Sequence, residues 1–309
     1  MKKVAFLCDH SFQYQLVGLQ KILQEDFLIC FFTKAELESL KKFNADMIIT
    51  VHSFGEDISA FFNQSKAKSI TIQDGIIEYA HSFLKKNSAA RYKPVLTDYI
   101  FVLGERSKKI LLSWSIPEEK ILVTGIPRFD EYKKQHQVEC EQDYLLVTSA
   151  NTPWFSKKTK RLFYEKYYML VEYLMASGIN FRLRLPNRVL RLAPESFINL
   201  IKEVYLSKND LLNDLCGAKA VISTPSTIVY EAMAMHKPFA LFKTSSETVY
   251  TQAAWEFTDI SDAKVIINEL LDPPKYKLSF QELILNENCS NIGNASFKIA
   301  NLVKSIINE

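Results

Sequence analysis

The sequence lacks the features that would place it in a membrane, in a redox system or on nucleic acid. No apolar run approaches the roughly 20 residues that span a bilayer. The start, Met1-Lys2-Lys3, leads directly into an apolar stretch, so we expect no signal peptide and a cytoplasmic protein. A net charge of +3, with no RNA- or DNA-binding signature, argues against a nucleic-acid partner.

The cysteine and glycine patterns argue against metal and dinucleotide cofactors. No C-x-x-C spacing occurs, so we expect buried thiols rather than disulfides or metal ligands. The five cysteines are Cys8, Cys30, Cys140, Cys216 and Cys289. The segment Cys8-Asp9-His10-Ser11-Phe12 follows the first apolar run and has none of the glycines of G-x-G-x-x-G, which disfavours a nicotinamide or flavin dinucleotide site.

Length and composition predict two globular domains. The chain has 309 residues, 48% hydrophobic and 24% charged, enough for two cores of about 150 residues each. A polar stretch, 133–142, reads as a linker. We therefore expect an N-terminal domain at 1–135, a C-terminal domain at 143–293 and a terminal helix at 294–309.

Apolar runs of strand length alternate with amphipathic segments, which predicts doubly wound parallel sheets. The expected strands are Val4–Cys8, Leu28–Phe32, Met47–Val51, Ser69–Ile72, Tyr99–Leu103, Ile121–Thr124, Tyr144–Thr148, Phe181–Leu185, Ala220–Ile222 and Pro238–Phe242. The expected helices include Tyr14–Leu23, Ser107–Trp114, Ile228–Met235, a short one beginning at Thr244–Glu247, Ala263–Leu271, Phe280–Leu285 and Ala295–Ile307.

The stretch from Ala218 to Phe242 is one β-turn-α-β unit, and its turn carries four hydroxyl side chains. Such a turn lies at the carboxyl edge of a parallel sheet, where the start of the following helix attracts a phosphate. The hydroxyls belong to Ser223, Thr224, Ser226 and Thr227. Glu231, one turn into the helix, is within reach of a ribose diol. The alternative is that these hydroxyls only cap the helix and that Glu231 is solvated or satisfied in the core.

The pattern S-T-P-S-T-x-x-x-E-A-M-A-x-x-K-P in this unit resembles the C-terminal donor-site signature of GT-B fold glycosyltransferases. Related signatures occur in bacterial surface and capsular polysaccharide enzymes, including polyol-phosphate and sialic-acid or Kdo-type transferases. The resemblance implies an α/β protein with two Rossmann-like domains facing a cleft, and a terminal helix that crosses back to the first domain. It also implies that Ser226 and Thr227 hold the nucleotide phosphates and that Glu231 holds the ribose.

The loop after the fourth expected strand brings two carboxylates and a histidine into nine residues, Gln73 to His81. Asp74 or Glu78 is a candidate general base for an acceptor hydroxyl. The alternative is that Asp74-Gly75 is turn chemistry and His81 a surface residue. The Gln73-Asp74-Gly75 element resembles the acceptor-side loop of sialic-acid and Kdo-type transferases.

A second block, Val123 to Asp130, has the pattern V-x-G-x-P-R-F-D, which resembles the end of the N-terminal domain in the same families. Its glycine and proline let the chain leave the sheet sharply, so we favour a structural role. The alternative is that Arg128 meets a phosphate.

Two basic regions of the second half admit functional and structural interpretations. Arg184 and Arg188 flank Leu185-Pro186, where the resembled families often carry a His-Pro pair, and either arginine could bind the donor phosphate in place of the histidine. The alternative is a solvated basic helix start. The basic, aromatic segment 154–175 could rest on the inner membrane surface or pack its aromatic face on a sheet.

These observations predict a glycosyltransferase that moves a sugar from a nucleotide-activated donor to a glycan or lipid-linked acceptor. No D-x-D element of the kind used by metal-dependent transferases occurs, so we expect no metal and no cofactor beyond the donor itself. The alternatives are a polyol-phosphate transferase, a nucleotide-sugar 2-epimerase of the same fold, and a non-catalytic scaffold of polysaccharide assembly.

Overall fold

The structure is a computed structural model that describes residues 1–51, 56–78, 92, 94–135, 143–153 and 156–308. Contacts divide the chain into two compact units. Unit 1 comprises Met1–Ile77, His81–Lys134 and Asn286–Glu309, and unit 2 comprises Glu78–Ala80 and Gln135–Leu285. Each is described here by itself.

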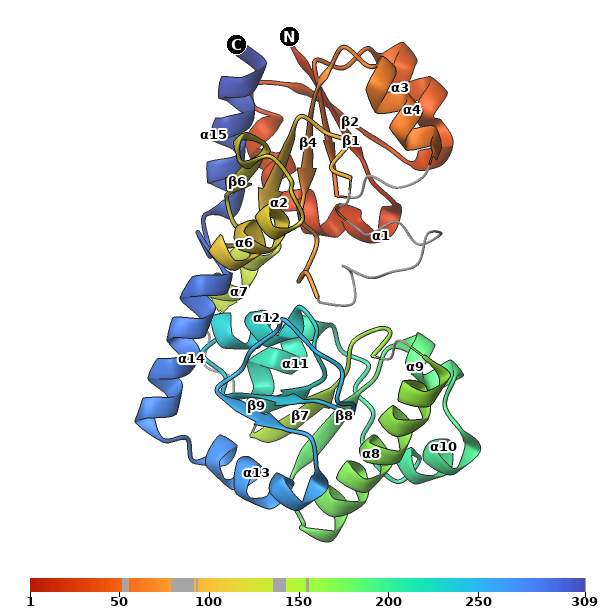
Figure 1. The fold of residues 1–309 in the computed structure, drawn as a ribbon, viewed down its shortest axis with the longest axis vertical. Helices are drawn as coiled ribbons and strands as arrows, with labels where there is room; N and C mark the ends of the chain where they lie inside the picture. Colours follow the sequence, from red (N-terminus) through yellow and green to blue (C-terminus); the bar gives the residue numbers. More distant parts are fainter. Residues whose placement is uncertain (52–55, 79–91, 93, 136–142, 154–155, 309) are drawn as a thin grey trace. The chain divides into compact units, whose positions relative to one another are not determined.

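Unit 1 is built on a parallel sheet with the strand order β2-β1-β3-β4-β5-β6 (Figure 1). The strands are β1 (Lys3–Leu7), β2 (Leu28–Phe32), β3 (Met47–Thr50), β4 (Lys68–Ile72), β5 (Tyr99–Val102) and β6 (Ile121–Val123). The helices of this part are α1 (His10–Gln13), α2 (Val17–Leu23), α3 (Leu37–Phe43), α4 (Glu56–Gln64), α6 (Glu105–Ser113), α7 (Phe129–Gln135) and α15 (Ala295–Asn308). Side chains of α3 and α4 pack on one face of the sheet, and α15 packs along α2.

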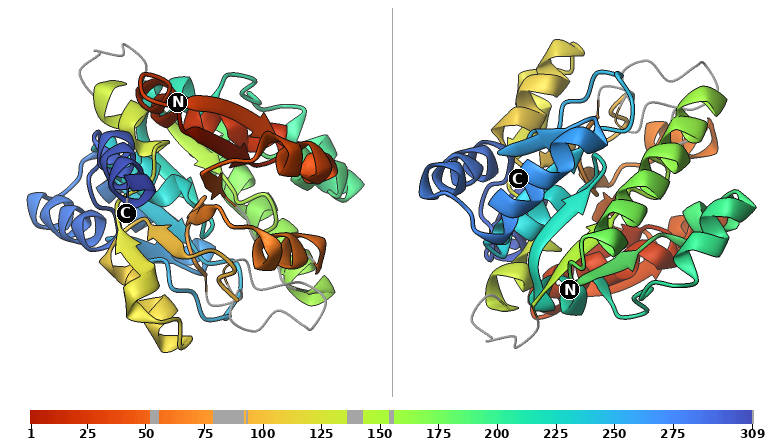
Figure 2. Two further views of the ribbon diagram at one scale, coloured as in Figure 1. Left: turned by 90° about the horizontal axis from the view of Figure 1, so that it is seen from above. Right: turned by 90° about the horizontal axis from the view of Figure 1, so that it is seen from below.

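Unit 2 holds a second parallel sheet, with the order β11-β10-β9-β7-β8. The strands are β7 (Tyr144–Thr148), β8 (Phe181–Arg184), β9 (Ala218–Ser223), β10 (Phe239–Phe242) and β11 (Trp255–Phe257). The helices are α8 (Lys157–Ala176), α9 (Asn187–Arg191), α10 (Glu195–Ile201), α11 (Leu211–Gly217), α12 (Ile228–Ala234), α13 (Ala263–Leu271) and α14 (Lys275–Asn288). Figure 2 gives two further views of both sheets with their helices.

The predicted fold class is confirmed: both sheets are parallel and doubly wound. The predicted strands agree with the observed ones to within about two residues at either end, because a strand buried on both faces is a continuous apolar run. One local prediction was wrong. Residues 244–247 form no helix, since Ser245 Oγ accepts the Glu247 N–H and donates to its carboxylate instead. The three-residue strand β11 was not predicted.

The cysteine prediction is only partly right. Cys8, Cys30 and Cys289 are free thiols, and burial raises the pKa of Cys8 to about 12, so this thiol is unreactive. Cys216 is disulfide-bonded, which contradicts the expectation for that residue. Cys140 lies outside the described residues.

In unit 1, the segment after α14 passes so close to the sheet that two positions must be glycine. A Cβ atom on Gly104 would lie 2.2 Å from the Asn288 carbonyl oxygen, and one on Gly125 would lie 2.1 Å from that of Ser290. Gly125 also has a φ of 74°. The Ser290 N–H donates to the Leu103 carbonyl at 2.8 Å. The V-x-G-x-P-R-F-D block therefore has a structural role, which is to contact the segment that follows α14.

The aspartate of the same block fixes helix α15. Asp130 is buried, and its two carboxylate oxygens accept the backbone N–H groups of Ala295 and Ser296 at 2.8 Å each. These are the first two residues of α15, whose N–H groups have no acceptor within the helix. A carboxylate 165 residues earlier in the chain thus caps the terminal helix.

We expect Asp130→Ala to lower the free energy of unfolding by about 2 kcal/mol, because it removes a charged cap and leaves two buried N–H groups without acceptors. Asp26→Ala is the matched control. Asp26 also contacts α15, through Lys304 at 2.5 Å, but its side chain is 52% exposed and its loss should cost about 0.5 kcal/mol. Urea unfolding measures both; equal losses would contradict the assignment.

Candidate functional site

The turn between β9 and α12 contains two buried and two partly exposed hydroxyls. Ser223 and Thr224 are buried, whereas Ser226 and Thr227 are half-buried. The Thr224 hydroxyl accepts the Ala150 N–H at 2.8 Å and so ties the loop after β7 to the turn. Thr224 therefore has a framework role, and Ser226 and Thr227 are the partly exposed hydroxyls of the turn.

Glu231 lies within the first turn of α12 and is 1% exposed. All residues of α12 are buried, so this helix packs inside unit 2, against β9 and β10. Glu231 lies one turn from Thr227, as the sequence predicted, but its side chain is buried in unit 2.

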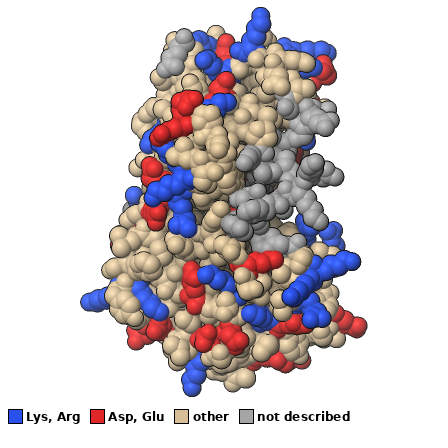
Figure 3. Space-filling view, viewed as in Figure 1, with Lys and Arg blue, Asp and Glu red and all other residues tan. Residues whose placement is uncertain are grey.

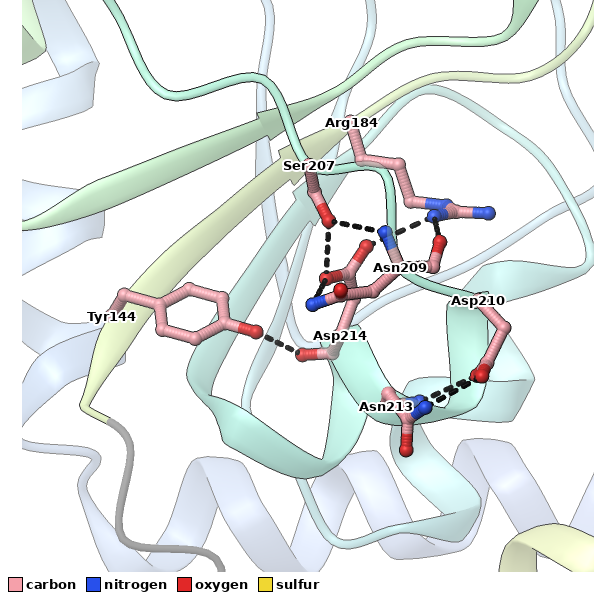
Figure 4. A network of polar contacts seen from close by, with 7 residues as sticks. All are labelled: Tyr144, Arg184, Ser207, Asn209, Asp210, Asn213 and Asp214. Atoms are coloured by element: carbon pink, nitrogen blue, oxygen red, sulfur yellow. Dashed lines mark hydrogen bonds and ion pairs between the residues drawn. The ribbon is translucent and has the colours of Figure 1, made fainter.

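Arg184, predicted to bind phosphate, is held in a network around the buried carboxylate of Asp214 (Figure 4). Its Nη1 lies 3.0 Å from Asp214 Oδ2 and also donates to the Asn209 carbonyl. The other carboxylate oxygen accepts from the Ser207 hydroxyl at 2.6 Å and the Asn209 amide at 3.3 Å. The Tyr144 hydroxyl donates to the Asp214 carbonyl at 2.8 Å. The positive charge of Arg184 is therefore paired with Asp214 inside unit 2.

Arg188 differs, because it is exposed on α9 just beyond the carboxyl end of β8. Strand β8 is separated from β9 by β7, so Arg188 is offset from the Ser223–Thr227 turn by two strand spacings, about 10 Å. Of the two predicted arginines, Arg188 is the one whose charge faces solvent.

Asp74 follows β4 and is 5% exposed. The Tyr92 hydroxyl donates to Asp74 Oδ1 and accepts the Asp74 N–H at 3.0 Å. Arg128 donates to the Asp74 carbonyl at 3.3 Å, and the Gln73 side chain bonds the Leu103 N–H at 2.9 Å and the Gly75 carbonyl at 2.6 Å. These bonds fix the Q-D-G element at the carboxyl end of the sheet of unit 1.

Glu78 belongs to unit 2 by its contacts and is buried there. Its Oε2 accepts the Tyr250 N–H at 2.8 Å, and its Oε1 accepts the Thr251 N–H at 3.0 Å and the Thr251 hydroxyl. Three donors thus occupy the oxygens to which a proton would have to move. The predicted His81 lies outside the described residues.

His10 is a titratable side chain that the sequence analysis passed over. It is exposed at the carboxyl end of β1, and its Nδ1 lies 3.2 Å from the Gln13 amide nitrogen. In the sheet order β1 is separated from β4 by β3 alone.

Metal and membrane features can be assessed for the described part of the chain only. There, no group of three or more His, Cys, Asp and Glu side chains is arranged to hold a metal ion. Nor does any helix in the described ranges have the length and apolar character needed to cross a bilayer. Phe163 and Tyr167 of α8 are buried in the core of unit 2, as the packing alternative predicted, and Tyr164 packs against Phe197 of α10. Trp154 and Phe155 lie outside the described residues.

Comparison with solved structures identifies the fold. UDP-GlcNAc 2-epimerase from Neisseria meningitidis bound to UDP-GlcNAc matches with a TM-score of 0.70 at 16% identity, over 100% of both chains. The Methanocaldococcus jannaschii UDP-GlcNAc 2-epimerase in complex with UDP-GlcNAc and UDP gives 0.71 at 14%, over 99% of this chain and 100% of that one. The wall teichoic acid polymerase TagF (H548A) gives 0.67 at 14%, over 99% and 89%. The chain has the fold of these enzymes. No family model and no curated protein matches its sequence.

The two predicted arginines should respond differently to substitution. Arg184→Gln leaves the buried Asp214 carboxylate without its cation and should lower the free energy of unfolding by about 2–3 kcal/mol. This is less than for a fully buried pair, because the Arg184 side chain is 29% exposed. Arg188→Gln removes an exposed charge and should change it by less than about 0.5 kcal/mol. Urea unfolding of both variants tests this, and a stability loss at Arg188 that equals the loss at Arg184 would refute it.

Proposed function

We propose that this protein is a glycosyltransferase that binds a nucleotide-activated sugar at the Ser223–Thr227 turn of unit 2. One observation carries the proposal. A turn with two accessible hydroxyls ends the central strand of unit 2, in a chain whose fold matches, over nearly its whole length, solved structures that hold UDP or UDP-GlcNAc. UDP and UDP-GlcNAc are ligands of those structures. That a nucleotide-activated sugar binds this chain at the Ser223–Thr227 turn is our proposal.

In this proposal the hydroxyls of Ser226 and Thr227 and the guanidinium of Arg188 stabilise the departing nucleotide. The bond between the sugar C1 and the phosphate oxygen breaks, and negative charge grows on that oxygen, where fixed donors lower the barrier. Glu231 accepts the ribose hydroxyls from the side of the turn. We propose that no metal and no further cofactor take part.

We assign the general base to Asp74 rather than to Glu78. A base must accept the proton of the acceptor hydroxyl as its oxygen bonds to C1. The Tyr92 hydroxyl donates to the Asp74 carboxylate and accepts the Asp74 N–H, so one side chain orients this carboxyl. Glu78 is held by the N–H groups of Tyr250 and Thr251 and by the Thr251 hydroxyl, so we give its carboxylate a structural role.

We expect one of CMP, CDP, UDP, GDP and ADP to raise the melting temperature of the protein without metal. A ligand at 100 times its Kd adds about 2.7 kcal/mol, which is a shift of a few degrees. Ser226→Ala and Thr227→Ala should reduce the shift. Ser246→Ala, an exposed serine after β10, is the control and should not change it. The proposed donor site would be contradicted if no nucleotide raised the melting temperature, or if the shift were the same in wild type and all variants.

We expect Asp74→Asn to lower turnover by a factor of about 10²–10⁴, the usual contribution of a general base, while the nucleotide-induced shift is kept. Glu78→Gln should mainly lower stability, with turnover within about tenfold of wild type. His10→Asn is the comparison variant. If it abolishes turnover and Asp74→Asn does not, the base is not Asp74.

A nucleotide-sugar 2-epimerase is the second candidate, favoured by the full-length match to two structures with UDP-GlcNAc. An epimerase acts on the donor alone. Proton NMR of UDP-GlcNAc with the protein in D₂O, without acceptor, separates the two reactions. A transferase leaves the C2 proton in place, whereas an epimerase exchanges it for deuterium and produces a second epimer. Nucleotide binding with neither reaction would favour a scaffold.

A further inference from the structure

Unit 2 carries an open pocket of about 810 Å³ along α8, apart from the Ser223–Thr227 turn. One wall is the exposed side of the first four turns of α8, and the other is the segment that leads from α9 into α10. The lining is mostly apolar and includes Met169 and Leu192, which are 50% and 37% exposed. Covering apolar side chains of this size with a ligand lowers the free energy of the system.

The floor of the pocket is rigid. The rings of Tyr164 and Phe197 meet edge to face with centroids 5.5 Å apart, and both residues belong to the buried core of unit 2. The Tyr164 hydroxyl donates to the Val189 carbonyl at 2.7 Å, and burial raises the pKa of Tyr164 to about 12. A preformed apolar floor costs no ordering when a ligand binds.

Charge is distributed unevenly along the pocket. Lys157, Lys160 and Arg161 line it at the start of α8, and Glu172 lines it near the other end. The fifth charged lining residue, Glu165, pairs with Arg161 at 3.1 Å. The basic and acidic ends are 15 residues apart on one helix, which is about 22 Å. In Figure 3, Lys and Arg side chains gather on the right of unit 2, over α9 and the start of α8.

The basic end lies toward the carboxyl edge of the sheet. Helix α8 follows β7, and β7 pairs with β9 in parallel, so the start of α8 is at the edge where the Ser223–Thr227 turn lies. The helix then runs back along the sheet (Figure 1). A ligand with its anionic group at the basic end therefore extends its remaining length away from that edge.

We propose that this pocket binds an amphiphile with a single phosphate head group and one long apolar chain. Lys157 and Lys160 contact the phosphate, and the chain lies over Tyr164 and Phe197 toward Met169 and Leu192. The length, the apolar lining and the position of the cations at one end all favour such a ligand over a compact anion. The inference rests on the pocket alone and does not depend on the proposed nucleotide site.

The probe for the test is dodecyl phosphate, titrated by calorimetry below its micellar concentration. Inorganic phosphate and an uncharged dodecyl glucoside are the comparison ligands. We expect saturable binding of dodecyl phosphate, with both comparison ligands at least about tenfold weaker, because each makes only half of the contacts.

Charge reversal at neighbouring lysines tests the head group. Lys157→Glu and Lys160→Glu should each weaken dodecyl phosphate binding about tenfold, since each replaces attraction with repulsion. Lys158→Glu is the matched control, because Lys158 is exposed in the same helical turn but does not line the pocket; its effect should be below about twofold. An equal effect at Lys158 would overturn the site in favour of a general surface charge.

Substitution on the apolar wall tests the chain. Met169→Glu should weaken binding about tenfold, whereas Val265→Glu, at a 61% exposed valine of α13 outside the pocket, should not. Circular dichroism confirms that each variant is folded. The proposal would be overturned if inorganic phosphate or dodecyl glucoside bound as tightly as dodecyl phosphate. It would also be overturned if the protein adsorbed to anionic phospholipid vesicles equally well with and without the Lys157 and Met169 substitutions. Nucleotide-induced thermal shifts should be unchanged in all five variants, which keeps this test separate from that of the donor site.

Discussion

The constraint on which the structure depends is that every strand pair in both sheets is parallel. Parallel neighbours need crossover connections, and these place helices on both faces of each sheet. The inner strands of both sheets are therefore largely buried, whereas the edge strands β2 and β8 are partly exposed. In unit 1 Asp74 lies just beyond the carboxyl end of β4, and in unit 2 the Ser223–Thr227 turn and Arg188, on α9, lie at the carboxyl ends of β9 and β8.

The same packing explains why the chain returns to its first unit at the end. In unit 1, Gly104 and Gly125 leave room for the backbone of Asn288 to Ser290, and Asp130 caps α15. Helix α15 then packs along α2, where the Ser296 Oγ would lie 3.1 Å from a Cβ atom at Gly18. Small residues and one carboxylate within the first 130 positions thus form the surface on which α15 packs.

Sequence reasoning succeeded where the physical signal is local and failed where it is long-range. The strand runs and the β9-turn-α12 unit were predicted because burial on two faces and turn chemistry are visible within a few residues. The strand β11 was not, since Trp255-Glu256-Phe257 is too short to show a pattern. The partner of Arg184 is 30 residues away and that of Glu78 is 173 away, and no spacing in the sequence predicts either. The sequence identifies candidate residues, but it does not show which of them are already bonded to other residues of the protein.

That distinction can be argued from what each buried carboxylate is bonded to. Asp130 accepts two backbone N–H groups, and Glu78 accepts two backbone N–H groups and the Thr251 hydroxyl, so both carboxylates tie together distant parts of the chain. Asp214 is paired with the Arg184 guanidinium inside unit 2. The Asp74 carboxylate is bonded to a phenolic hydroxyl, which rotates and can donate or accept. Asp74 is thus held by a side chain of its own unit rather than by backbone N–H groups, and this difference is one reason to prefer it to Glu78 in the proposed mechanism.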